Sequence, residues 1–242
     1  ANGCTVRNCW LVDTLGHSVI VWNEADPMGI AAKRGARSYV TIEGNLFEGS
    51  GTDRARIDCA RESASLDGIN HHIIIRNNQI KNVSGQAITI HAGSDIIVSG
   101  NQIDNAGRGM NVHNDLRNIV IAENVVTNIT AGHSIHIRST ASGANNIVIV
   151  DNVVATGANA GISVTGPTTA TIGHNRIMGC KYGIHTESYD RVPDVHPDDL
   201  LIVGNTIEST TQEAIFMYGG ARHVILANRI DKSGYGAIRL WP

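Results

Sequence analysis

The chain has 242 residues and a formal net charge of −3, so its bulk charge gives no reason to expect a nucleic-acid partner. Aromatic residues make up 4% of the sequence and Gly occupies 26 positions, a mixture that suits short β-branched strands separated by tight turns. No stretch approaches the roughly 18 continuous apolar residues of a membrane span, so no membrane partner is expected either.

The phrase Ile-x-Ile-x-x-Asn-x-Ile recurs, with small variations, along the chain. Its asparagines are Asn45, Asn78, Asn101, Asn124, Asn152, Asn175, Asn205 and Asn228. Four of the seven intervals between them are 23 residues, and the other three (33, 28 and 30) exceed that unit by loop insertions. An earlier copy of the phrase places Cys9 at the position of the Asn. The sequence therefore predicts about nine coils of roughly 23 residues each.

A second apolar strand follows each of these anchors about ten residues later. These strands cover residues 19–21, 57–59, 88–90, 110–112, 135–137, 162–164, 184–186, 215–217 and 238–240. Apolar residues alternate along them with period two, which indicates a strand with one buried face. A unit of two or three short strands without a helical pattern can bury that face only by stacking on copies of itself. We therefore predict an all-β solenoid that forms a single domain over residues 1–242.

The repeat resembles that of the pectin-lyase-like superfamily of right-handed parallel β-helices, whose coils carry internal ladders of Asn side chains. The resemblance covers essentially the whole chain and implies a single-stranded right-handed parallel β-helix. Each anchoring Asn is then expected to bond the backbone of its turn and the Asn of the next coil. This ladder is specific for the fold and uninformative about function.

The chain begins inside a coil and stops on a strand, and neither end shows a capping helix. We therefore expect a fragment of a longer protein, or ends that are covered by other domains or subunits. Loop insertions are expected near residues 23–38, 49–56 and 187–199.

The four cysteines are expected to remain free. Cys4, Cys9 and Cys59 are interpreted as small core residues. Cys180 falls in a turn without an obvious partner, so neither a disulfide nor a thiolate metal site is predicted.

A functional site must lie on an outer face, because the interior of such a solenoid is packed. The outward positions of the second strand form two columns. The first column contains Ile20, Asp58, Thr89, Asn111, His136, Ser163, His185, Phe216 and Arg239. The second contains Trp22, Ala60, His91, His113, Arg138, Thr165, Glu187, Tyr218 and Trp241. Four of these positions are His although the whole chain has 11 His, and we interpret the columns as a groove for a polysaccharide.

Acid–base chemistry is predicted in these columns. Equivalent side chains on neighbouring coils lie about 4.8 Å apart, so a contiguous stripe is expected on this face. A His is easily poised as a base near neutral pH, and Arg138 could bind a uronate carboxylate and stabilise an enolate-like intermediate. The catalytic candidates are His91, His113, His136, Arg138 and His185. The candidate substrate-binding residues are Thr89, Asn111, Glu187, Tyr189, Tyr218, Arg239 and Trp241. Either Tyr189 or Tyr218 could deliver a proton to the leaving oxygen.

The superfamily resemblance favours the same chemistry, since many members cleave or epimerise uronic-acid polymers. It implies a lyase that acts by β-elimination, or a C5-epimerase, on a polysaccharide in an extracellular or periplasmic location. No catalytic set carries over residue by residue. The Asp-Pro-His motif of bacterial alginate epimerases is missing, because Asp26-Pro27 precedes Met28 and His196-Pro197 precedes Asp198.

Other interpretations remain open. The histidines could be solvated residues on a flat sheet, or they could contact sugar without catalysis in a carbohydrate-binding or structural solenoid, such as a spike or adhesin segment. A glycoside hydrolase would need paired carboxylates, which only Glu24 and Glu62 offer. No cofactor is predicted, although calcium could bind the acidic residues of the 187–199 loop, Asp190, Asp194, Asp198 and Asp199.

Overall fold

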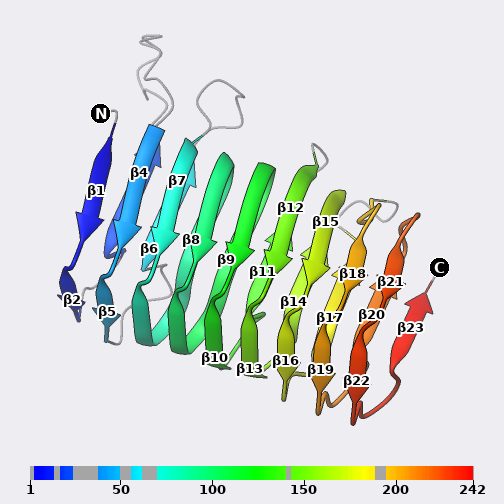
Figure 1. Cartoon of the computed structure of the whole chain (residues 1–242). Coiled ribbons are helices and arrows are strands. Elements are labelled where there is room, and N and C mark those ends of the chain that lie inside the picture. Colours follow the sequence, from blue (N-terminus) through cyan, green and yellow to red (C-terminus); the bar gives the residue numbers. More distant parts are fainter. Residues whose placement is uncertain are drawn as a thin grey trace.

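The computed structural model describes residues 3–13, 17–23, 38–49, 56–61, 70–139, 143–188 and 195–241. These residues form nine coils, and each strand pairs in parallel with the equivalent strand of the next coil (Figure 1). The two ends of the chain lie at opposite ends of the solenoid. The predicted parallel β-helix of the pectin-lyase-like type is confirmed.

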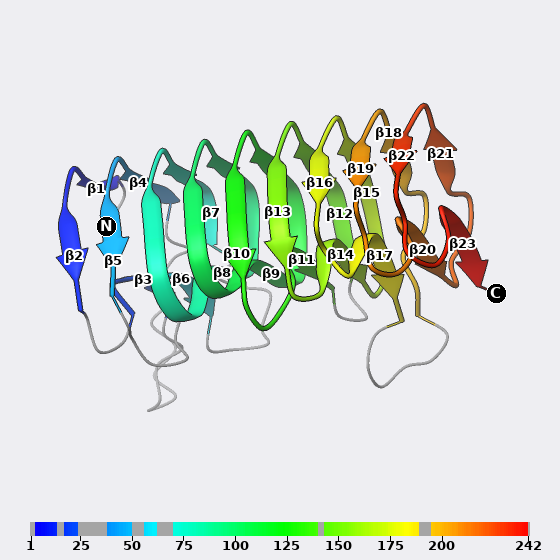
Figure 2. The ribbon, with the colours of Figure 1, turned by 90° about the horizontal axis from the view of Figure 1, so that it is seen from below.

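Three faces run along the solenoid, and β8 (Gln79–Ser99) and β9 (Gln102–Ala122) pass through all three. The first face adds β1 (Cys4–Arg7), β4 (Ser38–Glu43), β7 (Asn70–Arg76), β12 (Ala144–Val150), β15 (Thr168–Gly173), β18 (Leu201–Val203) and β21 (Val224–Leu226). The second, seen in Figure 2, adds β2 (Trp10–Val12), β5 (Leu46–Glu48), β10 (Val125–Ile129), β13 (Val153–Gly157), β16 (Arg176–Met178), β19 (Thr206–Glu208) and β22 (Arg229–Asp231). The third face adds β3 (Val19–Asn23), β6 (Ile57–Arg61), β11 (Ile135–Arg138), β14 (Ala160–Thr165), β17 (Tyr182–Glu187), β20 (Ile215–Tyr218) and β23 (Ile238–Trp241).

The core consists of columns of apolar side chains that point inward from each face. Because side chains alternate across a strand, residues in register on successive coils stack on one another. One such column on the second face is Phe47, Ile80, Ile103, Val126, Val154, Ile177 and Ile207. All of these side chains are buried, and their burial drives the stacking of coils that could not fold singly.

A continuous ladder of Asn side chains joins the first and second faces, as predicted. The Asn124 amide donates to Oδ1 of Asn152 at 2.9 Å and to the carbonyl of Val98 at 2.9 Å, while its backbone N–H donates to the same Oδ1 at 3.0 Å. The same side-chain bond links every neighbouring pair from Asn45 to Asn228. Cys9 donates its backbone N–H to Asn45 Oδ1, which confirms its place at the head of the ladder.

The turn before each ladder position is left-handed in all nine coils. The residues with positive φ there are Asn8, Gly44, Asn77, Gly100, Glu123, Asp151, His174, Gly204 and Ala227. Asn and Gly adopt this conformation at little cost, and six of the nine positions carry an Asn, Asp or Gly. At the other three positions, Glu123, His174 and Ala227, the ladder offsets the cost of the positive φ, since its hydrogen bonds fix the chain direction at every corner.

Two of the four cysteines differ from the prediction. Cys4 and Cys9 are exposed, so the prediction of core positions is wrong for them; both lie in the first coil that the structure describes, where they contact the following coil through Val40 and Asn45. Cys59 is buried as expected, and Cys180 is also buried. The expected loop insertions lie largely outside the described residues. No helix among the residues that the structure describes is long and apolar enough to cross a membrane.

We predict that Asn124→Ala lowers the free energy of unfolding by about 3 kcal/mol, because it leaves several buried backbone and amide groups without partners. Urea denaturation measures the change. The control is Asn145→Ala on β12, where the side chain is exposed and a change within about 0.5 kcal/mol is expected. Equal losses in the two variants would contradict a stabilising role for the ladder.

Candidate functional site

The third face presents both predicted columns in register. Thr89 pairs with Asn111, which pairs with His136. In the second column His91 pairs with His113, and His113 with Arg138. The structure therefore brings six of the predicted site residues onto three neighbouring coils. Tyr189, Glu24 and Glu62 lie outside the described residues.

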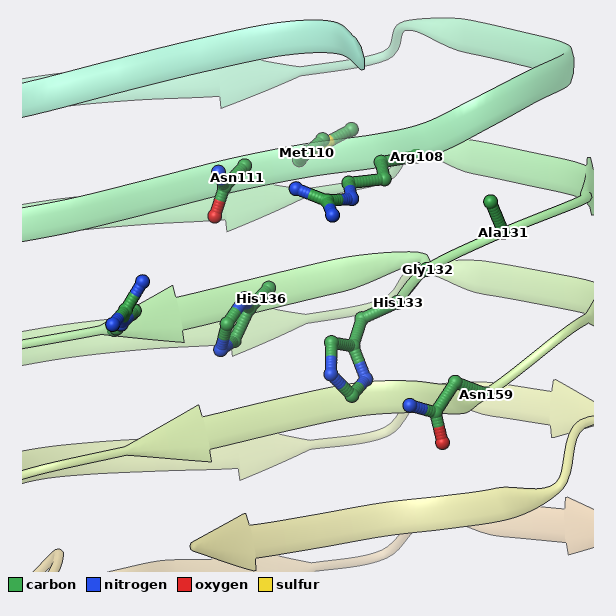
Figure 3. A pocket seen from close by; sticks show the side chains of 9 residues that line it. Arg108, Met110, Asn111, Ala131, Gly132, His133, His136 and Asn159 are labelled. Carbon is green, nitrogen blue, oxygen red and sulfur yellow. The ribbon is translucent and has the colours of Figure 1, made fainter. Parts of the chain in front are cut away.

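A polar cavity of about 250 Å³ lies in the middle of this face (Figure 3). Its polar lining consists of Arg108, Asn111, His133, His136, Arg138 and Asn159. The sequence columns included only Asn111, His136 and Arg138. Arg108 and His133 precede Asn111 and His136 by three residues, Arg108 within β9 and His133 just before β11, and this spacing is the signal that could have found them.

The Arg108 side chain owes its position to a glycine on the next coil. A Cβ at Gly132 would lie 2.6 Å from Cγ of Arg108, so any larger residue there would displace the arginine. Figure 3 shows the Arg108 side chain beside Asn111 on β9, with His133 and His136 on the following coil. The cavity thus receives one guanidinium from each of two adjacent coils.

The imidazoles at the cavity are held in the neutral form. Burial and the neighbouring Arg108 lower the pKa of His133 to about 4. Burial, together with His133 and Arg138, holds the pKa of His136 well below its usual range. The ring centroids of the two histidines are 4.7 Å apart. Neutral bases therefore stand beside two permanent cations, a combination that suits proton abstraction from a bound anion.

Hydrogen bonds orient both rings. The backbone N–H of Ala160 donates to Nδ1 of His133 at 3.3 Å, so the neutral ring carries its proton on Nε2 and acts as a donor from that atom. His136 Nε2 lies 3.2 Å from the hydroxyl of Thr165. His133 is thus suited to donate a hydrogen bond to a ligand, and His136 remains the candidate base.

Asn111 offers the cavity an acceptor. Its amide nitrogen donates to Oε1 of Gln86 at 2.7 Å, and this bond fixes the orientation of the side chain. Its Oδ1 is buried and has no hydrogen-bond partner among the described residues. A buried acceptor of this kind is satisfied by a ligand hydroxyl or a water molecule. Thr89 is only 2% exposed and also donates to Oε1 of Gln86, so it helps to hold the side chain that orients Asn111.

A second cluster lies toward the N-terminal end of the third face. Asp58 on β6 is 5% exposed, and its Oδ2 lies 3.2 Å from Nδ1 of His17. Its Oδ1 lies 3.6 Å from Nε2 of His91. The ring centroids of His91 and His113 are 3.9 Å apart. Burial, His91 and Arg138 lower the pKa of His113 to about 4. The columns contained Asp58, but the contribution of His17 was missed because it precedes its strand.

Aromatic stacking dominates the C-terminal end of the face. The ring of His185 contacts those of Tyr182 and Phe216 at centroid distances of 4.5 and 5.1 Å, and these two rings are 6.0 Å apart, so the three form a cluster. It is 5% exposed, and burial lowers its pKa to about 4. Arg239 lies over the rings of Phe216 and Trp241 and pairs with Glu213 at 2.9 Å.

The structure does not bring the predicted residues His185, Glu187 and Tyr218 to the cavity. His185 and Glu187, which are in contact at 3.2 Å, lie two coils beyond His136 and Arg138, about 10 Å away. Tyr218 lies three coils, or about 14 Å, beyond Arg138, too far to protonate a sugar held there. Its proposed role as proton donor therefore has no geometric support.

Possible metal ligands do not gather at one point in the described part of the chain. The residues that the structure describes contain no group of three or more His, Cys, Asp or Glu side chains placed to hold a metal ion. In the loop considered for calcium, Asp199 accepts a bond from Arg222 at 2.6 Å, and Asp198 accepts one from the backbone of Ala221. Asp190 and Asp194 lie outside the described residues.

The lowered pKa values predict a loss of stability in acid. A His whose folded pKa lies near 4 takes up a proton at higher pH in the unfolded chain, so the folded state loses stability as the pH falls from about 6.5 to about 4. Urea midpoints measured across this window should fall less steeply in a His113→Gln, His133→Gln variant. The exposed His174→Gln control should keep the wild-type slope. Identical slopes in all three proteins would contradict the neutral assignment.

Comparisons with known proteins place the chain in a family. The profile of a family described as periplasmic copper-binding protein (NosD) matches residues 17–193. Among solved structures, the Dettilon tailspike protein is similar, with a TM-score of 0.43 and 12% identity over 92% of this chain and 59% of that one. No curated protein matches. The chain belongs to the NosD family, whose description as periplasmic agrees with the expected location.

Proposed function

We propose that the third face binds a uronate-containing polysaccharide and that the central cavity removes the proton next to the carboxylate of one sugar unit. The observation that carries this proposal is the pairing of two guanidinium groups with neutral imidazoles around one polar cavity. The reaction is either β-elimination, as in a lyase, or C5-epimerisation.

The arginines supply recognition and activation. A guanidinium binds a carboxylate through two parallel charge-assisted hydrogen bonds, and Arg108 and Arg138 flank the space from adjacent coils. Removal of the proton at C5 places a second negative charge on the carboxylate group. Two cations in a partly desolvated cavity stabilise this charge more strongly in the transition state than in the bound substrate.

The remaining polar groups match the hydroxyls of a sugar. Asn111 Oδ1 accepts a hydrogen bond, and His133 Nε2 and the amide of Asn159 can donate one each. Neighbouring coils repeat every ~4.8 Å, which is close to the length of one sugar unit in an extended chain. A polymer lying along the solenoid would therefore place successive units on successive coils.

Copper binding is a second candidate, because the family to which the chain belongs is described as copper-binding. Neutral imidazoles are good ligands for copper. The described residues offer the close pair His91 and His113, but no group of three or more His, Cys, Asp or Glu side chains among them is placed to hold a metal ion, so we derive no step through a metal. Copper titration with calorimetry provides the check: saturable binding that disappears in His91→Asn and His113→Asn would favour metal binding over the sugar proposal.

We expect Arg108→Ala and Arg138→Ala each to weaken binding of oligouronates about 10- to 100-fold, the range for losing a hydrogen bond between charged groups. Calorimetry with alginate and pectate oligomers measures the affinity. The matched control is Arg117→Ala. Arg117 lies on β9, as Arg108 does, but its side chain is exposed on the first face. It should bind as wild type does.

Turnover is measured on the same samples. Ultraviolet absorbance of unsaturated uronates reports elimination, and proton NMR reports epimerisation. The proposal predicts one of these activities in the wild-type protein and its loss in His136→Gln. Binding that depends on Arg108 and Arg138 without either activity would indicate a carbohydrate-binding solenoid. Absence of binding would overturn the proposal.

A further inference from the structure

We propose that the cluster at the N-terminal end of the third face is the proton-donating half of the same site: Asp58 holds His91, and His91 passes a proton to His113 at the edge of the cavity. This inference rests on the proposed function. It replaces the tyrosine donors considered from the sequence, of which Tyr218 is about 14 Å from Arg138.

The carboxylate of Asp58 is buried between two imidazoles. One oxygen lies 3.2 Å from Nδ1 of His17, and the other lies 3.6 Å from Nε2 of His91. The second oxygen has no hydrogen bond among the described residues and is shielded from solvent. A buried carboxylate without compensation is costly, so a proton shared within this trio is favourable. Burial raises the pKa of Asp58, and the two histidines oppose the rise.

Ring contact connects this trio to the cavity. The His91 and His113 rings are in contact at a centroid distance of 3.9 Å, and Arg138, which lines the cavity, pairs in register with His113 on the next coil. His91 is partly exposed, with 30% of its side-chain surface accessible, so it can exchange protons with solvent. Asp58, His91, His113 and Arg138 thus lie on four successive coils, from the buried carboxyl group to the cavity in which we propose that the sugar binds.

The charges at the two ends of the site have opposite signs. Around His133 and His136 the nearby charged groups are Arg108 and Arg138, which disfavour protonation. Around His91 burial lowers the pKa, and the carboxylate of Asp58 opposes the fall. The group in this cluster whose pKa is raised is the Asp58 carboxyl, which therefore keeps its proton to higher pH than an ordinary carboxyl. A carboxyl of raised pKa and imidazoles of lowered pKa on one face can serve as the acid and the base of one active site.

In an elimination at this site, each proton that moves has a donor and an acceptor. His136 takes the proton from C5, the C4–O4 bond breaks with its electron pair on O4, and the N–H of the neutral His113 ring gives its proton to O4. As this proton leaves, His91 returns one to His113, and the protonated carboxyl of Asp58 returns one to His91. Before the next turnover, His136 releases its proton to solvent and the Asp58 trio takes one up from solvent.

The test is Asp58→Asn, which keeps the shape of the side chain and removes its charge. We expect kcat/KM for an oligouronate to fall about 100-fold, the lower range for losing general acid catalysis, while the Kd changes less than about twofold. NMR titration should show a lower pKa for the imidazole of His91, because the charge of Asp58 no longer opposes the effect of burial. The control is Asp104→Asn on β9, an exposed carboxylate of the second face, with no expected effect.

A second variant keeps the inference testable if Asp58→Asn fails to fold. His91→Gln should give a similar loss of kcat/KM, and combining the two changes should add little, because both interrupt one path. Full turnover in Asp58→Asn or in His91→Gln would overturn the relay and leave the proposed function standing. Absence of oligouronate binding by the wild-type protein would overturn both.

Discussion

The stacked amides of the Asn ladder are the interaction on which the rest of the structure depends. Each side chain bonds the Asn of the next coil and a backbone carbonyl of the preceding coil through its amide, so the corner between the first and second faces has the same geometry in every coil. Loops of very different length can then be inserted elsewhere in a coil. The strands on either side of them return to the same register, and the outward columns of the third face stay aligned.

The alignment gives the site its electrostatic character. Polar side chains on adjacent coils are forced within about 4.8 Å of one another, and each partly buries its neighbour. For His113, His133 and His136 this burial disfavours the charged form, and nearby arginines add to the effect. Burial also disfavours the charged form of Asp58, whose pKa is raised although the imidazoles of His17 and His91 lie on either side of the carboxyl. The same scaffold thus yields neutral imidazoles at the cavity and a carboxyl of raised pKa toward the N-terminal end of the face.

Most of the fold could be predicted from the sequence, because period and pattern carry it. The spacing of the asparagines gave nine coils, and the two columns of the third face agree with the observed register from Thr89 to His185. Exposure at the first coil could not be predicted, because Cys4 and Cys9 follow the same pattern as the buried residues of later coils.

The site was predicted less completely, and for a physical reason. His133 and His17 precede their strands, where the period-two rule does not apply. Arg108 lies within β9, just after the register of β8 and β9 shifts between Val83 and Gln86, and such a shift of one residue redirects the side chain. Conversely, the pattern placed His185 and Tyr218 on the correct face but could not show their distance from the cavity or the contacts of His185 with two aromatic rings.

A crystal structure of the protein with a bound uronate oligosaccharide would test the central claim most directly. The account predicts a carboxylate held between Arg108 and Arg138, with C5 of that sugar facing His136, its hydroxyls at Asn111, and the chain running along the coils. A saccharide bound on another face, or one on the third face whose carboxylates point to solvent away from both arginines, would contradict it.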